Sequence, residues 1–413
     1  MNKTLIAQLA LRYLRGKGTA NAVPVLSRIS MVAIAVSSCA MIILFSVFNG
    51  FGDLVDNLYK AFYPEIKISA AKGKFFTPEK RIMEIIAQSE AVETSAFVLE
   101  DNVLVNTEDG ETIPVTLKGI GKDYFKVNEV KPHVTKGVDS VIEQPVPTAI
   151  LGQHIAATLG VDVDNVFARM MVYYPNGAAE AGSLNPTDAF QSMVLKPDGS
   201  FFVQEEFDTK YILAPLSNVQ ELMRQQGNVS SIEIKLKPGF SSENLKEKLQ
   251  QKLGPDFVVA TRYEQNKAVY MVMRSEKWAG YAILLFVLLI ASFNMVSALS
   301  LLVLEKQKDM GIMRTMGILP SALSKVILLE GVLWALVGGG IGLGLGLILC
   351  WAQVQFKLLK IPGAFIIDAY PVAVIWSDVL VVLLTVSAVG FLAAIYPARR
   401  AARQKLHEIM AGK

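Results

Sequence analysis

A short run of charged and methionine side chains carries the clearest potential for chemistry in this sequence of 413 residues. The run comprises Glu305, Lys306, Lys308, Asp309, Met310, Met313, Arg314 and Met316. The charges can form ion pairs across an interface, and methionine is a side chain that adapts to varied protein surfaces. A solvated loop would explain the charges but not three methionines spaced every three residues. The pattern therefore favours a docking surface for a protein partner.

Catalytic chemistry is not indicated elsewhere in the chain. The sequence contains no Walker A, H-E-x-x-H, G-x-S-x-G or C-x-x-C pattern. The three histidines are scattered singly, and Cys39 and Cys350 both lie in apolar runs. The basic arrays typical of nucleic-acid binders are also missing. We expect a chain that is not an enzyme, has no cofactor or metal and does not bind nucleic acid, so that energy must come from a partner.

Four apolar runs predict the elements that position this segment. Hydrophobic residues make up 52% of the chain and charged residues 19%, and each run reaches the ~20 residues that span a bilayer. The predicted transmembrane helices are 24–52, 274–305, 326–356 and 372–398. The first run starts too late and is too long for a cleaved signal peptide. Since no Pro or Gly follows Leu304 at once, the second helix is expected to continue into water.

Small residues predict how these helices pack. Gly338, Gly342 and Gly346 recur every four residues, the spacing that lets helix backbones approach closely in lipid. A phosphate-binding glycine loop is disfavoured because no strand precedes these residues and no Lys-Ser/Thr pair follows. We expect them to pack helices.

Residues 53–273 predict a large α+β domain outside the membrane. Strand-like alternation flanks two expected helices, one opened by Thr77-Pro78-Glu79 and one by Ser241-Ser242-Glu243-Asn244. These two β-α-β units would form one lobe, 53–95 with 227–273. Segment 96–226 is richer in strands and turns, with a hairpin expected at Glu108-Asp109-Gly110, and would be a second lobe inserted into the first.

One excursion in the inserted lobe has two open interpretations. It contains Pro175, Asn176, Gly177, Asn185 and Pro186. It could be a plain surface loop, or an arm that protrudes toward a partner. The residue types leave both possibilities open.

Basic residues beside the helix ends predict the orientation. They concentrate in 1–23, 306–325 and 399–413, whereas 357–371 holds only Lys357 and Lys360. We expect a cytoplasmic interfacial helix in 1–23, a cytoplasmic loop at 306–325 and a cytoplasmic tail at 399–413. The linker 357–371 and the large domain would lie on the opposite side.

Two stretches carry a family resemblance. Phe293-Asn294-Met295-Val296-Ser297 and the run from Leu304 to Gly317 resemble the lipoprotein-releasing (Lol-type) permeases of the FtsX-like/MacB-like superfamily. The ends Asn49-Gly50-Phe51 and Tyr396 to Ala402 are similar as well. The resemblance implies a type VII ABC permease with four transmembrane helices, a porter-like lobe and an inserted sabre-like lobe, in the inner membrane of a bacterium.

The same resemblance implies a function and partners. Two permeases, identical or paralogous, would flank a cytoplasmic ABC ATPase dimer that carries the ATP and Mg and docks on the 305–316 segment. A lipoprotein would enter from the outer leaflet between helices 1 and 2 and pass to a periplasmic chaperone, which the 175–190 excursion could engage.

Helix geometry suggests which residues would line such a cavity among the membrane lipids. The candidates are Met41, Phe45, Phe48, Tyr281 and Phe286. Plain helix packing is the competing interpretation for each of them. Two other functions also remain open: MacB-like export of a drug or peptide, and FtsX-like signalling to a cell-wall hydrolase.

Overall fold

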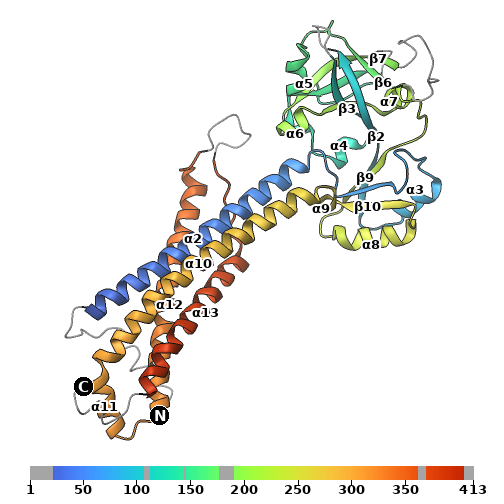
Figure 1. Cartoon of the computed structure of the whole chain (residues 1–413). Coiled ribbons are helices and arrows are strands. Elements are labelled where there is room, and N and C mark those ends of the chain that lie inside the picture. Colours follow the sequence, from blue (N-terminus) through green and yellow to red (C-terminus); the bar gives the residue numbers. More distant parts are fainter. Residues whose placement is uncertain (1–21, 107–111, 144–145, 176–189, 361–368, 404–413) are drawn as a thin grey trace, which may run out of the picture. The chain divides into compact units, whose positions relative to one another are not determined.

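The chain divides into two compact units, a helical unit of residues 1–54 with 271–413 and a sheet-rich unit of residues 55–270. A computed structural model describes residues 22–106, 112–143, 146–175, 190–360 and 369–403 (Figure 1). Four of the described helices are long and apolar enough to cross a membrane. The helices that make up or enter the helical unit are α2 (Ala22–Tyr59), α10 (Lys267–Glu305), α11 (Gln307–Thr315), α12 (Pro320–Phe356) and α13 (Trp376–Arg403).

The spanning helices are longer than predicted. Helix α2 begins two residues before the predicted start, so that Pro24 lies in its first turn, where a missing N–H is tolerated. The predicted end at residue 52 is wrong, because α2 continues through Gly50 and on to Tyr59. A Cβ on Gly50 would lie 2.4 Å from the carbonyl carbon of Pro371. The glycine therefore permits a close chain approach and does not stop the helix.

Helix α12 packs through glycine on two faces. Toward α2, a Cβ on Gly338, Gly342 or Gly346 would lie within 2.8 Å of atoms of Met31, Ala35 and Ile42, respectively. Toward α13, a Cβ on Gly331 or Gly339 would meet Ala394 or Val386 within 2.7 Å. Such contacts leave no room for any larger residue, which is how helices gain close backbone packing in lipid.

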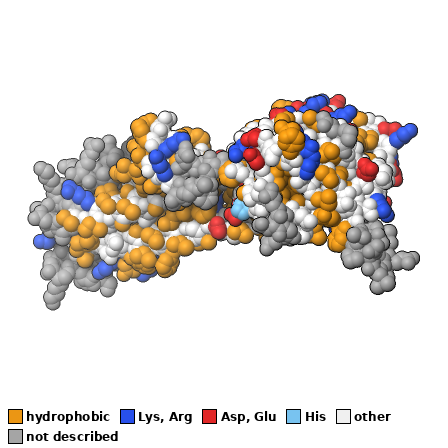
Figure 2. All heavy atoms as spheres, turned by 90° about the horizontal axis from the view of Figure 1, so that it is seen from above, with side chains coloured by type: hydrophobic (Ala, Val, Ile, Leu, Met, Phe, Trp, Pro, Cys, Tyr) orange, Lys and Arg blue, Asp and Glu red, His pale blue; other side chains and the backbone are white. Residues whose placement is uncertain are grey.

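The outward faces of these helices remain apolar. Exposed side chains include Val32, Phe286 and Ile348. In the space-filling view, hydrophobic side chains dominate the surface of the helices, whereas charged ones gather on the sheet-rich unit (Figure 2). A surface of this kind is suited to hydrocarbon.

The sheet-rich unit is built on one sheet of ten strands among the described residues, in the order β10-β1-β9-β2-β3-β8-β5-β7-β4, with β6 paired to β2 and β7. The strands are β1 (Ile66–Ala70), β2 (Val92–Asn106), β3 (Thr112–Ile120), β4 (Val134–Gly137), β5 (Thr148–Gly152), β6 (Met170–Pro175), β7 (Phe190–Phe201), β8 (Tyr211–Pro215), β9 (Ser231–Leu236) and β10 (Phe257–Thr261). The helices are α3 (Lys80–Ala87), α4 (Tyr124–Val127), α5 (Gln153–Thr158), α6 (Glu205–Asp208), α7 (Leu216–Leu222), α8 (Ser242–Leu253) and α9 (Arg262–Gln265), with a 3₁₀ turn at Lys131–His133.

Both expected β-α-β units are present, as β1-α3-β2 and β9-α8-β10. Helix α3 begins at Lys80, because Thr77 does not cap it and instead bonds the side chain of Asn228. The predicted lobe boundary at 95–96 falls inside β2, so the two lobes share a continuous sheet. The expected hairpin is supported by the pairing of Asn106 with Thr112, while its turn lies outside the described residues.

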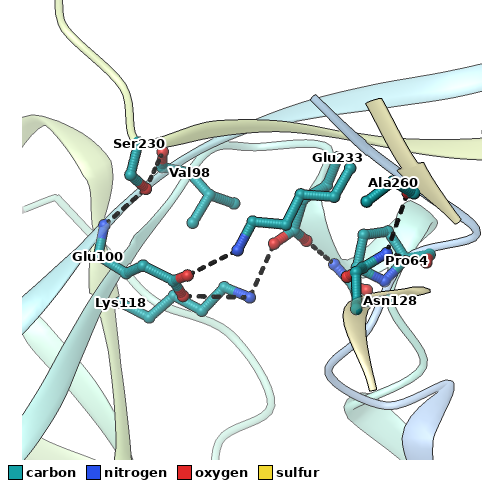
Figure 3. A network of polar contacts seen from close by, with 10 residues as sticks. Pro64, Val98, Glu100, Lys118, Asn128, Ser230, Glu233 and Ala260 are labelled. Atoms are coloured by element: carbon teal, nitrogen blue, oxygen red, sulfur yellow. Dashed lines mark hydrogen bonds and ion pairs between the residues drawn. The ribbon is translucent and has the colours of Figure 1, made fainter. Parts of the chain in front are cut away.

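A buried row of charges crosses this boundary. The ammonium of Lys118 on β3 lies 2.8 Å from Glu233 on β9 and 3.8 Å from Glu100 on β2, and Lys67 on β1 pairs with Glu100 at 2.8 Å (Figure 3). Asn128 donates a hydrogen bond to Glu233. Burial alone would raise the pKa of Glu100, but Lys118 and Lys67 outweigh it and hold that pKa at about 2. Each carboxylate in the row is thus compensated by a cation.

Removing one member of this row should destabilise the sheet-rich unit. Lys118→Met leaves Glu233 buried without its cation, which costs about 3–5 kcal/mol of unfolding free energy. Lys118→Met combined with Glu233→Leu should recover part of this loss, since Glu100 keeps Lys67 while the buried Asn128 amide loses its acceptor. Pulse proteolysis of the full chain across a urea series measures the unfolding free energy of the single and the double variant. Equal stability of the wild type and Lys118→Met would contradict the assignment.

Replacing two polar residues in opposite halves of α12, Glu330 and Gln353, should change the thermal midpoint in opposite directions. Glu330 is fully buried, and neither carboxylate oxygen has a hydrogen-bond partner among the described residues. Gln353 bonds the backbone of Leu359 twice and the carbonyl of Tyr370. Glu330→Met should raise the thermal midpoint by about 2–4 °C, because an unpaired buried carboxyl is costly.

The matched change Gln353→Leu should lower that midpoint, since the N–H of Leu359 and the carbonyl of Tyr370 lose the partner that the Gln353 side chain gives them. Tryptophan fluorescence of the purified chain follows both variants, because Trp334 and Trp351 lie on α12. A lower midpoint for Glu330→Met as well would show that this carboxyl stabilises the helices.

Candidate functional site

The segment between α10 and α12 forms a separate short helix. Helix α10 ends at Glu305, and Lys306 leaves the helical region with φ −87° and ψ 9° before α11 begins. The expectation of one continuous helix is therefore wrong at this residue. Lys306 still donates its N–H to Leu302 and accepts from Met310, so it closes one helix while opening the next.

The far end of α11 is a tight stop. Gly317 has φ +88°, a conformation that favours glycine. The N–H of Ile318 bonds the carbonyl of Met313, and that of Gly317 bonds Arg314. These are features of a glycine-terminated helix end. Pro320 then starts α12, so α11 is fixed between two spanning helices by very short connections.

The methionines of α11 do not share one face. Met310 is buried and Met313 packs against the same hydrophobic core, whereas Met316 is 78% exposed. Steps of three residues advance about 300° around a helix, so Met310 and Met316 lie about 120° apart. The predicted methionine face is therefore wrong for Met310.

The exposed apolar face of α11 and its C-terminal end is formed by other residues. Ile312, Met316 and Leu319 are each at least 60% exposed. Ile312 and Met316 follow Lys308 at four-residue spacing, which places the three on one helix face. Only Met316 of this apolar set was identified from the sequence, where regular methionine spacing concealed the better i, i+4 pattern.

The charged residues surround this face. Lys308 and Asp309 are exposed, Arg314 is half-buried, and Lys306 lies 3.7 Å from Asp309. Glu305 is half-buried, with neither carboxylate oxygen hydrogen-bonded within the described part of the chain. The combination of apolar centre and charged rim is typical of a protein interface.

The candidate cavity residues on α2 and α10 fall into two groups. The ring of Phe45 stacks on that of Tyr281 at 5.5 Å, and Met41 is buried beside them in the helical core. Phe48 is half-buried, and Phe286 is 65% exposed on the outer face of α10. The structure brings Met41, Phe45 and Tyr281 into one core but does not bring Phe286 to them.

A polar cluster lies at the same end of these helices and was missed in the sequence. The ammonium of Lys277 on α10 lies 2.8 Å from the Asn49 side-chain oxygen on α2 and 3.0 Å from Asp378 on α13. Asn49 donates to Asp378 at 2.7 Å. Asn49, Lys277 and Asp378 each lie beside an apolar run in the sequence. Their position at the same end of three predicted helices is the sequence signal that could have revealed the cluster.

The possible partner arm is only partly described. Pro175 ends β6, while Asn176, Gly177, Asn185 and Pro186 lie outside the described residues. The choice between loop and arm stays a prediction.

Comparison with known proteins agrees with this architecture. Residues 281–406 match the FtsX-like permease C-terminal family. The chain is 24% identical over 414 residues to the lipoprotein-releasing system transmembrane protein LolC of Xylella fastidiosa, covering 98% of both chains. It is 26% identical to LolC of Neisseria meningitidis (98% and 99% covered) and 25% identical to LolE of Haemophilus influenzae (97% and 98% covered).

Among solved structures, the periplasmic region of MacB from Actinobacillus actinomycetemcomitans aligns with 53% of this chain and 98% of its own, at 12% identity and a TM-score of 0.34. The end-to-end similarity to permeases, with the family match over the last three spanning helices, assigns the architecture. The chain is thus similar from end to end to the lipoprotein-releasing permeases, and its last three spanning helices match the FtsX-like permease C-terminal family.

Proposed function

We propose that this chain is the permease subunit of an ABC transporter that extracts lipoproteins from the outer leaflet of a bacterial inner membrane. ATP hydrolysis on a separate cytoplasmic ATPase drives the extraction, and a periplasmic chaperone receives the product. The proposal rests on one structural observation: α11 presents an exposed apolar face on a helix joined directly to two spanning helices. Full-length similarity to permeases named for lipoprotein release supports the choice of cargo.

The exposed face of α11 suits a protein partner better than lipid. Ile312, Met316 and Leu319 provide apolar contact, and Lys308 and Asp309 beside them provide charges of both signs. Anchoring apolar side chains within a polar rim are typical of stable protein contacts. The partner is an ABC ATPase dimer that holds the ATP and Mg, because the sequence of this chain has no Walker A motif.

Force on α11 would reach the membrane helices without a flexible linker. A single residue, Lys306, separates α11 from α10, and four residues separate it from α12. Displacement of α11 by ATPase closure therefore moves the ends of both helices. The proposed orientation places α11 and both termini in the cytoplasm and the sheet-rich unit in the periplasm.

The cargo offers acyl chains to the membrane helices and a protein chain to the periplasm. Acyl chains are accommodated by apolar helix faces such as that of Phe286 and Ile290 on α10. The second permease of the complex is another copy of this chain or a paralogue.

Charge introduced on the exposed face of α11 should uncouple the transporter. The double variant Ile312→Glu with Met316→Glu should reduce permease-stimulated ATP hydrolysis about tenfold or more, because it buries two carboxylates at an apolar contact. The matched control is Phe240→Glu, at a similarly exposed apolar residue of the sheet-rich unit. Full stimulation of ATP hydrolysis by the double variant would exclude docking on this face.

Native mass spectrometry of the purified complex tests the cargo and partners. We expect two permeases, two ATPases and a bound acylated protein. A co-purifying cell-wall hydrolase without acylated protein would instead support signalling. A bound drug or peptide would support MacB-like export.

A further inference from the structure

The half of α10 toward Lys267, here called its outer half, is less buried than the half toward Glu305. All the buried residues of α10 lie between Leu288 and Val303. From Lys267 to Val287 every side chain is at least partly exposed. The half of α10 toward Glu305 is therefore anchored in the hydrophobic core, and the half toward Lys267 is enclosed much less.

Near the start of α10, Tyr270 donates to Asp56 on α2 at 2.6 Å, and further along Leu284 and Leu285 pack on the hydrophobic core. Between them, the contacts that hold this half are specific. Lys277 donates to Asn49 on α2 and to Asp378 on α13, and its ammonium lies 4.9 Å from the centre of the Phe45 ring. One turn further along α10, Tyr281 stacks on Phe45 and bonds the hydroxyl of Thr385 on α13 at 2.8 Å. A Cβ on Gly280 would lie 2.8 Å from a methyl carbon of Leu44.

The three polar side chains satisfy one another. The Asn49 amide accepts from Lys277 through its oxygen and donates to Asp378 and to the Ala373 carbonyl through its nitrogen. The Lys277–Asp378 pair is about one-third exposed or less on both sides. Asp378 lies in the first turn of α13, where the helix dipole favours a carboxylate. Charge-assisted bonds of this kind are strong, yet they can be exchanged with water at a partly exposed site.

We propose that Asn49, Lys277 and Asp378 form a polar latch that closes the gap between α2 and α10, and that the latch opens during the transport cycle. The inference rests on the proposed function for what passes through the gap, the acyl chains of a lipoprotein. The Phe45–Tyr281 pair lies directly beneath the latch, so opening separates these rings and exposes an apolar passage between the two helices. With the latch closed, the outer half of α10 rests against α2.

Disulfide trapping tests the opening in the complete complex with its ATPase. The reporter carries Leu44→Cys and Gly280→Cys in a background with Cys39→Ala and Cys350→Ala. Leu44 Cγ lies 3.6 Å from a Cβ built on Gly280, which suits a disulfide between the new thiols. We expect cross-linking to be fast without nucleotide and slower during ATP turnover. Equal rates in both conditions would overturn the opening.

Two further variants test whether the polar side chains hold the gap closed. Lys277→Met in the reporter chain should slow cross-linking, since losing such a charged contact shifts the closed–open equilibrium toward the open form by roughly tenfold. The control Arg274→Met removes an exposed cation one turn earlier on α10 and should have no effect. The exchange Lys277→Asp with Asp378→Lys should restore cross-linking, because the Asn49 amide can rotate to serve both new partners. No effect of Lys277→Met would overturn the latch.

Lipoprotein release from proteoliposomes separates this inference from the proposed function. The oxidised reporter should release no lipoprotein, and a reductant should restore release. Undiminished release by the oxidised reporter would overturn the latch alone. If the wild-type complex releases no lipoprotein while cross-linking still responds to ATP and to Lys277→Met, the latch stands and the proposed cargo is wrong.

Discussion

Close contact between helix backbones is the constraint on which the helical unit depends. Hydrocarbon surrounds these helices, so burying an apolar side chain between them gains little compared with leaving it in lipid. Glycine solves this problem on two faces of α12, where Gly338 and Gly342 meet α2 and Gly339 meets α13. The three helices are thereby held at short range over several turns. Helix α10 packs against these helices mainly along the half that ends at Glu305. Its buried residues therefore all lie between Leu288 and Val303.

The sheet-rich unit depends on a different interaction, the ionic row of Lys67, Glu100, Lys118 and Glu233. These residues come from four strands that lie on both sides of the predicted lobe boundary. Because each buried charge requires its neighbours, the strands cannot separate there without leaving a charge uncompensated. The row thus ties the strands of both lobes into one sheet.

Much of this architecture follows from the sequence because its signals are long and local. Four apolar runs, two β-α-β units and the glycine spacing on α12 each depend on many residues with the same tendency. The errors arise where a single residue decides the outcome. Lys306 separates α10 from α11 without any Pro or Gly, and α2 continues past its predicted end at residue 52 to Tyr59. The face of α11 was misassigned because a three-residue spacing drifts around the helix. The Asn49–Lys277–Asp378 cluster joins residues 101 to 329 positions apart in the chain, which no local pattern reveals.

The length of α10 gives it mechanical leverage. Its 39 residues, at about 1.5 Å each, make a rod of roughly 58 Å. A tilt of only ~5° about one end displaces the other by about 5 Å, close to the width of an acyl chain. A movement too small to disturb the packed core around Leu299 would thus be magnified at Lys277. Stiffness, more than flexibility, would then be the property of this helix that matters most for transport.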